Sequence, residues 1–260
     1  MHTSGPNNVF LGFGAGTFTM SGSYNTGIGQ GALLSNTTGS FNTTEGRSAL
    51  RLNTTGAYNS AVGYRALTAN TIGSDNTGHG CNALNLNING NDNTALGYGA
   101  LRTGTAASSN PAVGSYALTS NITENNNPAT VWGTLRDDTT GRENTAAGWA
   151  ALFANTTGRG NTAIGQLAMS ANTTANFNPA IGGGALQANT GGAAGPRLGR
   201  FRAGPWSGRG GWRDGCALQH TMRGRVKRRG AGRPPLESRR GPRRSGGVAP
   251  PPLYPTAVVC

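Results

Sequence analysis

The sequence predicts an all-β protein whose main part is a parallel β-solenoid, a rod in which each turn of the chain stacks on the turn before it. Asn recurs every 17 residues from Asn8 to Asn178 without insertion or deletion. Each repeat carries one motif, Asn-Thr-Ala-apolar-Gly-x-x-Ala-Leu-x-x-Asn-Thr-Thr-Gly-x-x. Seventeen residues are too few for two helices and a turn, and the Asn, Thr and Gly content disfavours helix. Repeats this regular stack as identical structural units.

The composition divides the chain into unlike parts. A hydrophobic fraction of 35%, an aromatic fraction of 7% and 44 glycines argue against a conventional globular core. Residues 1–190 carry seven Arg and seven acidic residues, whereas residues 191–260 carry the other fifteen basic residues and two acids, hence the whole net charge of +13. We therefore predict a partial repeat at residues 1–7, eleven repeats at 8–194, and a disordered Arg/Gly/Pro-rich tail at 195–260.

Each repeat is numbered here from position 1, the recurring Asn, to position 17. Positions 2 to 6 predict one short strand and positions 8 to 12 predict a second. The Thr-Thr-Gly and Gly-x-x stretches predict corners, where glycine tolerates positive φ. Since parallel strands pair ~4.8 Å apart, eleven such coils make a rod of roughly 50 Å.

Two apolar columns, at positions 4 and 9, are expected to fill a thin interior, with Ala at position 8 where the backbone approaches closely. Glu45, His79 and Thr130 interrupt the position-4 column, and we expect weaker coils there. The predicted core residues are Ile28, Leu33, Val62, Leu67, Leu96, Leu101, Val113, Leu118, Ile164, Ile181 and Leu186.

The recurring asparagines predict a structural ladder, because stacked amides can bond to one another or to a corner of the backbone. A second common Asn, at position 12, as in Asn36 and Asn155, has the same potential. The ladder expected at position 1 comprises Asn25, Asn42, Asn59, Asn76, Asn93, Asn110, Asn127, Asn144, Asn161 and Asn178.

Position 6 varies freely, as an outward-facing site does, and we expect the side chains of positions 6 and 10 to face outward. Exposed aromatic side chains supply much of the energy at protein interfaces. The predicted partner contacts are therefore Tyr64, Tyr98, Trp132, Trp149 and Phe153. A contact between chains of a trimer is the alternative role for the same residues.

Motifs for catalysis or metal binding are weak, and we predict no enzyme, no cofactor and no metal site. The Gly-x-Gly stretches at Gly12, Gly29 and Gly97 share one repeat phase, and no helix follows them to bind phosphate. His79 is expected in the core column as a tolerated substitution. Asp137, Asp138 and Glu143 form the densest acidic spot but lack a calcium-repeat motif, and Cys81, Cys216 and Cys260 lack metal-ligand spacing. No run approaches the ~18 apolar residues of a membrane helix, so no membrane insertion is expected.

Asn161-Thr-Ala-Ile-Gly and Asn93-Thr-Ala-Leu-Gly-Tyr-Gly-Ala-Leu resemble the head repeats of YadA-like trimeric autotransporter adhesins and related arrays in phage tail-fibre and bacterial surface proteins. The resemblance covers residues 2–194, although the 17-residue unit is longer than the adhesin repeat. It implies a left-handed parallel β-roll, a homotrimer, and a surface that binds a host receptor, matrix or surface glycan. We accordingly expect a non-enzymatic structural or adhesive segment outside the cell, on a cell or virion surface.

Two other functions stay open. In the first, a monomeric solenoid uses flat threonine arrays to bind ice or polysaccharide, and the arrays are Thr37–Thr38, Thr54–Thr55, Thr156–Thr157 and Thr173–Thr174. Alternatively, the tail at 195–260 binds nucleic acid through its basic residues, with Trp206 and Trp212 stacking on bases. This last role requires the tail to be genuine, and the competing interpretation is an out-of-frame translation of GC-rich DNA. The chain opens in the middle of a coil, which we interpret as a fragment of a longer array.

Overall fold

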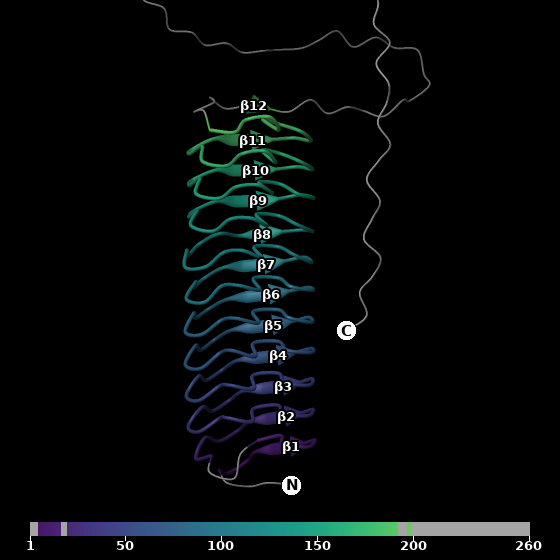
Figure 1. The fold of residues 1–260 in the computed structure, drawn as a ribbon, viewed down its shortest axis with the longest axis vertical. Helices are drawn as coiled ribbons and strands as arrows, with labels where there is room; N and C mark the ends of the chain where they lie inside the picture. Colours follow the sequence, from purple (N-terminus) through teal and green to yellow (C-terminus); the bar gives the residue numbers. More distant parts are fainter. Residues whose placement is uncertain (1–4, 17–19, 192–196, 199–260) are drawn as a thin grey trace, which may run out of the picture. The chain divides into compact units, whose positions relative to one another are not determined.

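The computed structural model describes residues 5–16, 20–191 and 197–198, and these form a parallel β-solenoid (Figure 1). One parallel sheet runs along the rod in the order of the sequence. Paired residues are 17 apart, as in Thr26 opposite Thr43, so the predicted fold of one coil per repeat is confirmed. The strands are β1 (Val9–Leu11), β2 (Thr26–Ile28), β3 (Thr43–Glu45), β4 (Ser60–Val62), β5 (Thr77–His79), β6 (Thr94–Leu96), β7 (Pro111–Val113), β8 (Ala129–Thr130), β9 (Thr145–Ala147), β10 (Thr162–Ile164), β11 (Pro179–Ile181) and β12 (Arg197–Leu198).

The second strand predicted at positions 8 to 12 is wrong. Position 9 lies in the left-handed region, with φ of 53° at Leu33 and 47° at Leu50, and position 7 does too, with φ of 56° at Arg65. A left-handed residue turns the chain and cannot continue a strand. Successive coils still bond there, because the Leu50 N–H donates to the Ala66 carbonyl oxygen at 3.0 Å.

The interior is filled by positions 3, 8 and 9. Position 3 is the middle residue of each strand and points inward, and it is small, as in Ala61, Ala95 and Ala163. The leucines of position 9 fill the space that these small residues leave. Leu33, Leu67, Leu101 and Leu118 are fully buried as predicted, and Leu186 is partly buried against the same core.

The prediction that position 4 lies in the core is wrong. Adjacent strand residues point to opposite sides, so with position 3 inside, positions 2 and 4 face outward. Glu45 and Thr130 therefore lie in solvent and cannot weaken a core. The position-4 residues predicted as core are exposed at Ile28, Val113, Ile164 and Ile181 and half-buried at Val62 and Leu96.

The predicted ladder at position 1 is present and buried. The Oδ1 of Asn25 accepts the Asn42 backbone N–H at 3.0 Å and the Asn42 Nδ2 at 3.1 Å. The same pattern recurs at Asn59, Asn76 and Asn93. Each amide thus bonds two coils together inside a thin core, where an unpaired polar group would destabilise the fold.

The position-12 asparagines form a second ladder, in which Asn53 Nδ2 donates to Asn36 Oδ1 at 2.7 Å. The two ladders meet at the position-15 carbonyl, because Gly56 O accepts Asn42 Nδ2 and Asn53 Nδ2, both at 2.9 Å. A Cβ added at Gly56 would lie 2.5 Å from Asn53 Oδ1. This close approach explains the glycine at position 15.

The strand ladder continues past the boundary predicted at residue 194. Strand β12 pairs with β11 at the repeat spacing, with Ala180 opposite Arg197 and Ile181 opposite Leu198. Residues 1–4, 17–19, 192–196 and 199–260 lie outside the described part of the chain. Apart from β12, the predicted tail at 195–260 lies outside the described residues, and so do the predictions of disorder, nucleic-acid binding and frame error made for it.

Candidate binding face

Positions 6, 7 and 10 form columns on one side of the rod. The position-7 N–H donates to the position-6 carbonyl of the preceding coil, as from Arg65 to Arg47 at 3.0 Å. The position-11 N–H donates to the position-10 carbonyl of the next coil, as from Leu52 to Thr68 at 3.0 Å. We call this surface the arginine–aromatic face, and its charged and aromatic members are Phe13, Arg47, Arg51, Tyr64, Arg65, Tyr98, Arg102, Tyr116, Trp132, Arg136, Trp149 and Phe153.

Four of the five predicted contact residues come together on this face. Trp132 stacks on Trp149 with ring centroids 5.3 Å apart, and its centroid is 6.3 Å from that of Phe153. The Tyr116 ring makes edge-to-face contacts with two neighbours. Its centroid is 6.4 Å from that of Trp132 and 5.2 Å from that of Tyr98. These five side chains are half-buried and make one aromatic cluster.

Tyr64 does not join the aromatic cluster. Its ring lies under the guanidinium of Arg65, which is 5.2 Å from the ring centroid. Tyr116 belongs to the cluster but is not among the predicted contacts, because the sequence predicts outward-facing side chains only at positions 6 and 10. The sequence does distinguish Tyr116, because it is the aromatic residue at a position that the other repeats fill with Gly, Ser, Arg, Asn, Ala or Leu.

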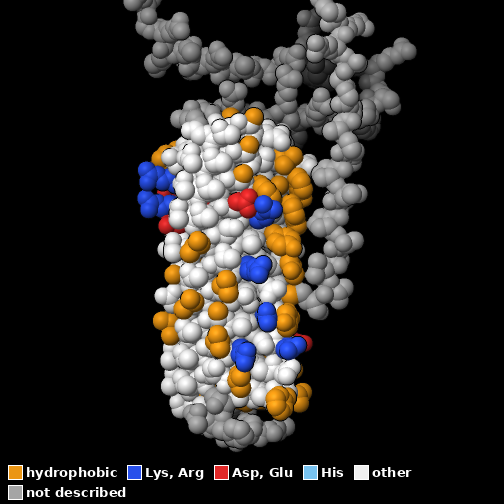
Figure 2. All heavy atoms as spheres, in the orientation of Figure 1, with side chains coloured by type: hydrophobic (Ala, Val, Ile, Leu, Met, Phe, Trp, Pro, Cys, Tyr) orange, Lys and Arg blue, Asp and Glu red, His pale blue; other side chains and the backbone are white. Residues whose placement is uncertain are grey.

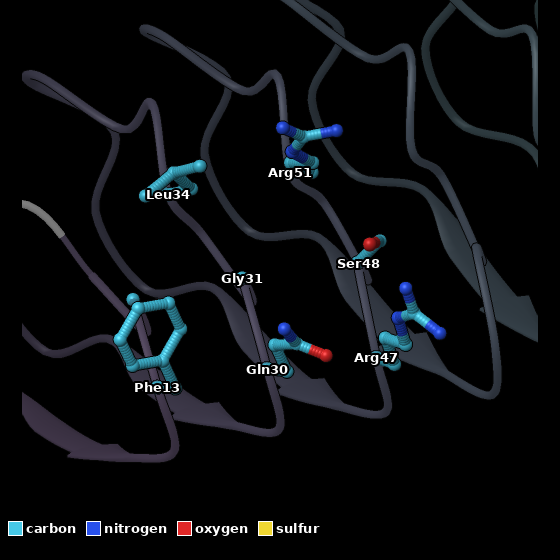
Figure 3. A pocket seen from close by; sticks show the side chains of 8 residues that line it. Phe13, Gln30, Gly31, Leu34, Arg47, Ser48 and Arg51 are labelled. Atoms are coloured by element: carbon cyan, nitrogen blue, oxygen red, sulfur yellow. The ribbon is translucent and has the colours of Figure 1, made fainter.

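Two arginines border a hollow on this face (Figure 3). The hollow has a volume of about 240 Å³, and Gly14 and Gly31 are among the residues that line it. Arg47 and Arg51 come from positions 6 and 10 of one coil, and Figure 3 shows their guanidiniums on either side of Ser48. The remaining lining side chains are Phe13, Gln30 and Leu34. The hollow therefore offers positive charge, amide and hydroxyl groups, and an apolar edge.

Further along the face Arg136 contacts the aromatic cluster. Arg136 lies over Phe153, with its Cζ 3.9 Å from the ring centroid, and pairs with Asp137 through Nε–Oδ1 at 2.8 Å. Burial and the adjacent Tyr98 hydroxyl raise the pKa of the Tyr116 phenol, while the Arg102 guanidinium opposes this rise. Tyr116 is thus neutral at physiological pH, and Arg102 lies close enough to influence it.

The structure contains a second aromatic array, which the repeat motif does not predict. Tyr24, Phe41 and Tyr58, all at position 17, stack with centroids 5.0 and 4.9 Å apart and planes within 3°. Three consecutive repeats carry an aromatic residue at position 17, which is a signal in the sequence, but the repeat motif predicts only a corner there. The ring faces cover one another, so this array stabilises neighbouring coils.

The other sequence candidates do not form a site. His79 was predicted in the core but is exposed, and its Nε2 lies 3.0 Å from Ser60 Oγ. Asp137 is paired with Arg136, Asp138 is buried and Glu143 is exposed, so the three acids do not converge. Across residues 5–16, 20–191 and 197–198, no three His, Cys, Asp or Glu side chains are grouped so as to hold a metal ion. A Cβ added at Gly29 would lie 2.6 Å from the Gly46 carbonyl group, which gives this Gly-x-Gly stretch a packing role.

One acid is built into the position-12 ladder. Asp138 is fully buried, and its Oδ1 accepts Asn155 Nδ2 at 2.9 Å and the Gly141 N–H at 3.0 Å. Its Oδ2, which replaces the amide nitrogen of the other coils, has no hydrogen-bond partner. Burial raises the pKa of this carboxyl to about 8, so it is largely protonated at neutral pH.

Comparison with protein families, curated proteins and solved structures gives no significant match. The part of the chain that the structure describes contains no helix long and apolar enough to cross a membrane.

Proposed function

We propose that this chain is a non-enzymatic structural and adhesive segment of a surface fibre, acting outside the cell on a cell or virion surface. The observation that carries the proposal is the arginine–aromatic face. The coils are held by buried asparagine ladders and small interior residues, so the aromatic cluster and the arginines are not required to form the core. Aromatic and Arg side chains gathered on one side of a rigid rod are typical of protein binding surfaces.

The same proposal includes association of the rod as a homotrimer. The aliphatic residues of position 4, predicted to lie inside, form a stripe on the outer face of the sheet that Glu45, His79 and Thr130 interrupt. Ile28, Ile164 and Ile181 are 40%, 42% and 44% exposed. An exposed apolar stripe along a sheet favours burial against another protein surface. Contact between chains through this stripe leaves the arginine–aromatic face free for a receptor, matrix or surface glycan.

The threonine-array alternative has less support. Thr37 Oγ1 donates to the Thr54 carbonyl at 2.8 Å, and Thr156 Oγ1 donates to the Thr173 carbonyl at 3.0 Å. Half of the threonines in the supposed array are therefore engaged with the backbone of the next coil. The adhesive role depends on side chains without this structural use.

Binding of the full chain to immobilised matrix proteins and glycans tests the adhesive proposal. We expect the wild type to bind and Tyr64→Ser to bind more weakly, because Tyr64 lies on the arginine–aromatic face. Tyr58→Ser is the matched control, since Tyr58 belongs to the stacked array at position 17. A wild type that binds no surface, or a pair of variants that lose binding equally, contradicts the proposal.

A further inference from the structure

We propose that the arginine–aromatic face binds a linear acidic polysaccharide bearing carboxylate groups, lying along the axis of the rod. This inference rests on the adhesive function proposed above and names the class of ligand. It places the strongest contacts at Arg47, Arg51, Arg65 and Arg102.

Charge on the solenoid is segregated by column. Five of the seven arginines in residues 1–190 occupy positions 6, 7 or 10, whereas Asp75, Asp92 and Glu143 occupy position 17. Figure 2 shows Lys and Arg side chains spaced along one face of the rod, beside a band of hydrophobic side chains. Among the described residues, Arg136 with Asp137 is the one salt bridge. The other four guanidiniums on this face are therefore not neutralised by a described carboxylate, and the face attracts anions.

The arginines are arranged along the rod axis. Arg51, Arg102 and Arg136 share position 10 and are separated by three coils and then two. At ~4.8 Å per coil these separations are roughly 14 and 10 Å. Arg65 occupies the coil that follows Arg51. A compact anion would reach one of these levels, whereas an extended polymer parallel to the axis reaches all of them.

The groups between the arginines suit hydroxyl-rich sugars. Ser48 and Gln30 line the hollow beside Arg47. Thr68 Oγ1 donates to the Ser48 carbonyl at 2.9 Å, and this fixes its hydroxyl oxygen as an acceptor toward solvent. A guanidinium binds a carboxylate through two parallel N–H bonds, which an amide or ammonium cannot reproduce. Sparse guanidiniums with neutral polar groups between them match a polymer with many hydroxyls and intermittent carboxylates.

Single-stranded nucleic acid fits this face less well. Its binding depends on bases that stack on free aromatic faces. Here Trp132 stacks on Trp149, Arg136 covers Phe153, and Arg65 lies over Tyr64. One face of each of these rings is already occupied, whereas sugar carboxylates and hydroxyls need only the guanidiniums and polar groups.

The test measures the affinity of the full chain for polygalacturonate oligomers at physiological ionic strength. The test variant is Arg51→Gln/Arg102→Gln, and the matched control is Arg142→Gln/Arg159→Gln at position 16, which removes the same charge from a different column. All of these arginines are exposed, and the basic tail is unchanged in every variant, so folding and tail binding are common to them. We expect about a tenfold loss of affinity for the test variant and less than about twofold for the control, since only the first loses carboxylate contacts.

Neutral dextran and single-stranded oligothymidine are the comparison ligands. Weak dextran binding, together with a smaller effect of the test variant on oligothymidine, supports the inference. Equal losses in the two arginine variants overturn it, as does an Arg51- and Arg102-dependent preference for oligothymidine. If the chain binds matrix proteins or neutral glycans independently of these arginines, the adhesive proposal stands and the inference fails. If it binds no surface or glycan at all, both fail.

Discussion

Asp138 occupies a place where every neighbouring coil needs an amide. An Asn at position 12 accepts through Oδ1 and donates through Nδ2, as Asn155 Nδ2 donates to the Gly158 carbonyl at 3.0 Å. A carboxylate can only accept, so its second oxygen would face a carbonyl without a proton between them. Burial without a donor for the second oxygen disfavours the charged form, so the pKa of Asp138 is raised to about 8 and the carboxyl is held in its protonated form.

We expect the free energy of unfolding to fall as the pH rises from about 4 to about 8 because of Asp138. The unfolded carboxyl titrates near pH 4, and the folded carboxyl near pH 8. The folded state therefore holds the extra proton between these values, and the loss is at most about 1.4 kcal/mol per pH unit. Asp138→Asn should remove this slope and raise stability at pH 8, as measured by thermal unfolding from pH 5 to 9. Parallel pH profiles for the two proteins would rule the explanation out.

Replacement of one position-1 asparagine should strongly destabilise the rod. Asn59 donates to Asn42 Oδ1 and the Gly73 carbonyl, and it accepts from the Asn76 N–H and Nδ2. We expect Asn59→Ala to lower the free energy of unfolding by about 3 kcal/mol, because buried partners on both sides lose their bonds. Chemical denaturation measures this. Asn89→Ala is the control, since Asn89 is exposed and should change stability by less than about 0.5 kcal/mol.

At the scale of one coil, the position-12 ladder is interrupted where Gly104 replaces Asn. Asn87 Oδ1 consequently has no hydrogen-bond partner, although it is buried. The same coil has Ala107 at position 15, where most coils have Gly. An Asn at position 12 bonds less closely to the carbonyl of position 15 when that residue is Ala. Asn172 Nδ2 lies 3.3 Å from the Ala175 carbonyl oxygen, whereas Asn53 Nδ2 lies 2.9 Å from the Gly56 carbonyl oxygen.

Restoring the ladder should stabilise this coil. Gly104→Asn/Ala107→Gly supplies an amide for Asn87 Oδ1 and clears space beside it, and we expect a gain of about 1 kcal/mol. A Cβ at Gly104 would lie 3.3 Å from the Asn121 carbonyl and Leu101 Cγ, so the backbone must yield by a few tenths of an ångström. Ala107→Gly alone is the comparison and should not stabilise. If the double variant melts no higher than the wild type, the unpaired Asn87 Oδ1 does not lower the stability of the rod.

The repeat period was enough to predict the coil and its register, but not the orientation of the strand. Ile28 and Ile164 were assigned to the interior because they are apolar, whereas the small residues at position 3 face inward. Positions 3 and 4 are neighbours in a three-residue strand, so their side chains cannot both point inward. The smaller side chains, those of position 3, are the ones that fit the thin interior. The turn at Leu33 was not predictable from propensity, because leucine disfavours positive φ in isolation and adopts it here to enter the core. The aromatic cluster was largely predictable, since its members share outward phases.

For the whole molecule, the outward position-4 column predicts how copies of the rod associate. We expect sedimentation to give a mass near three times 26.4 kDa for the wild type. Ile164→Asp/Ile181→Asp should give a single-chain mass, because it places two adjacent carboxylates, unlike the single Glu45 of the wild type, on the contact between chains, where they repel one another and are costly to desolvate. The variant should still fold, since Glu45 occupies the same column in solvent. Gln166→Asp, at position 6, is the control and should leave the trimer intact. A wild type that sediments as one chain would contradict the trimer, and the exposed aliphatic stripe would then need another partner.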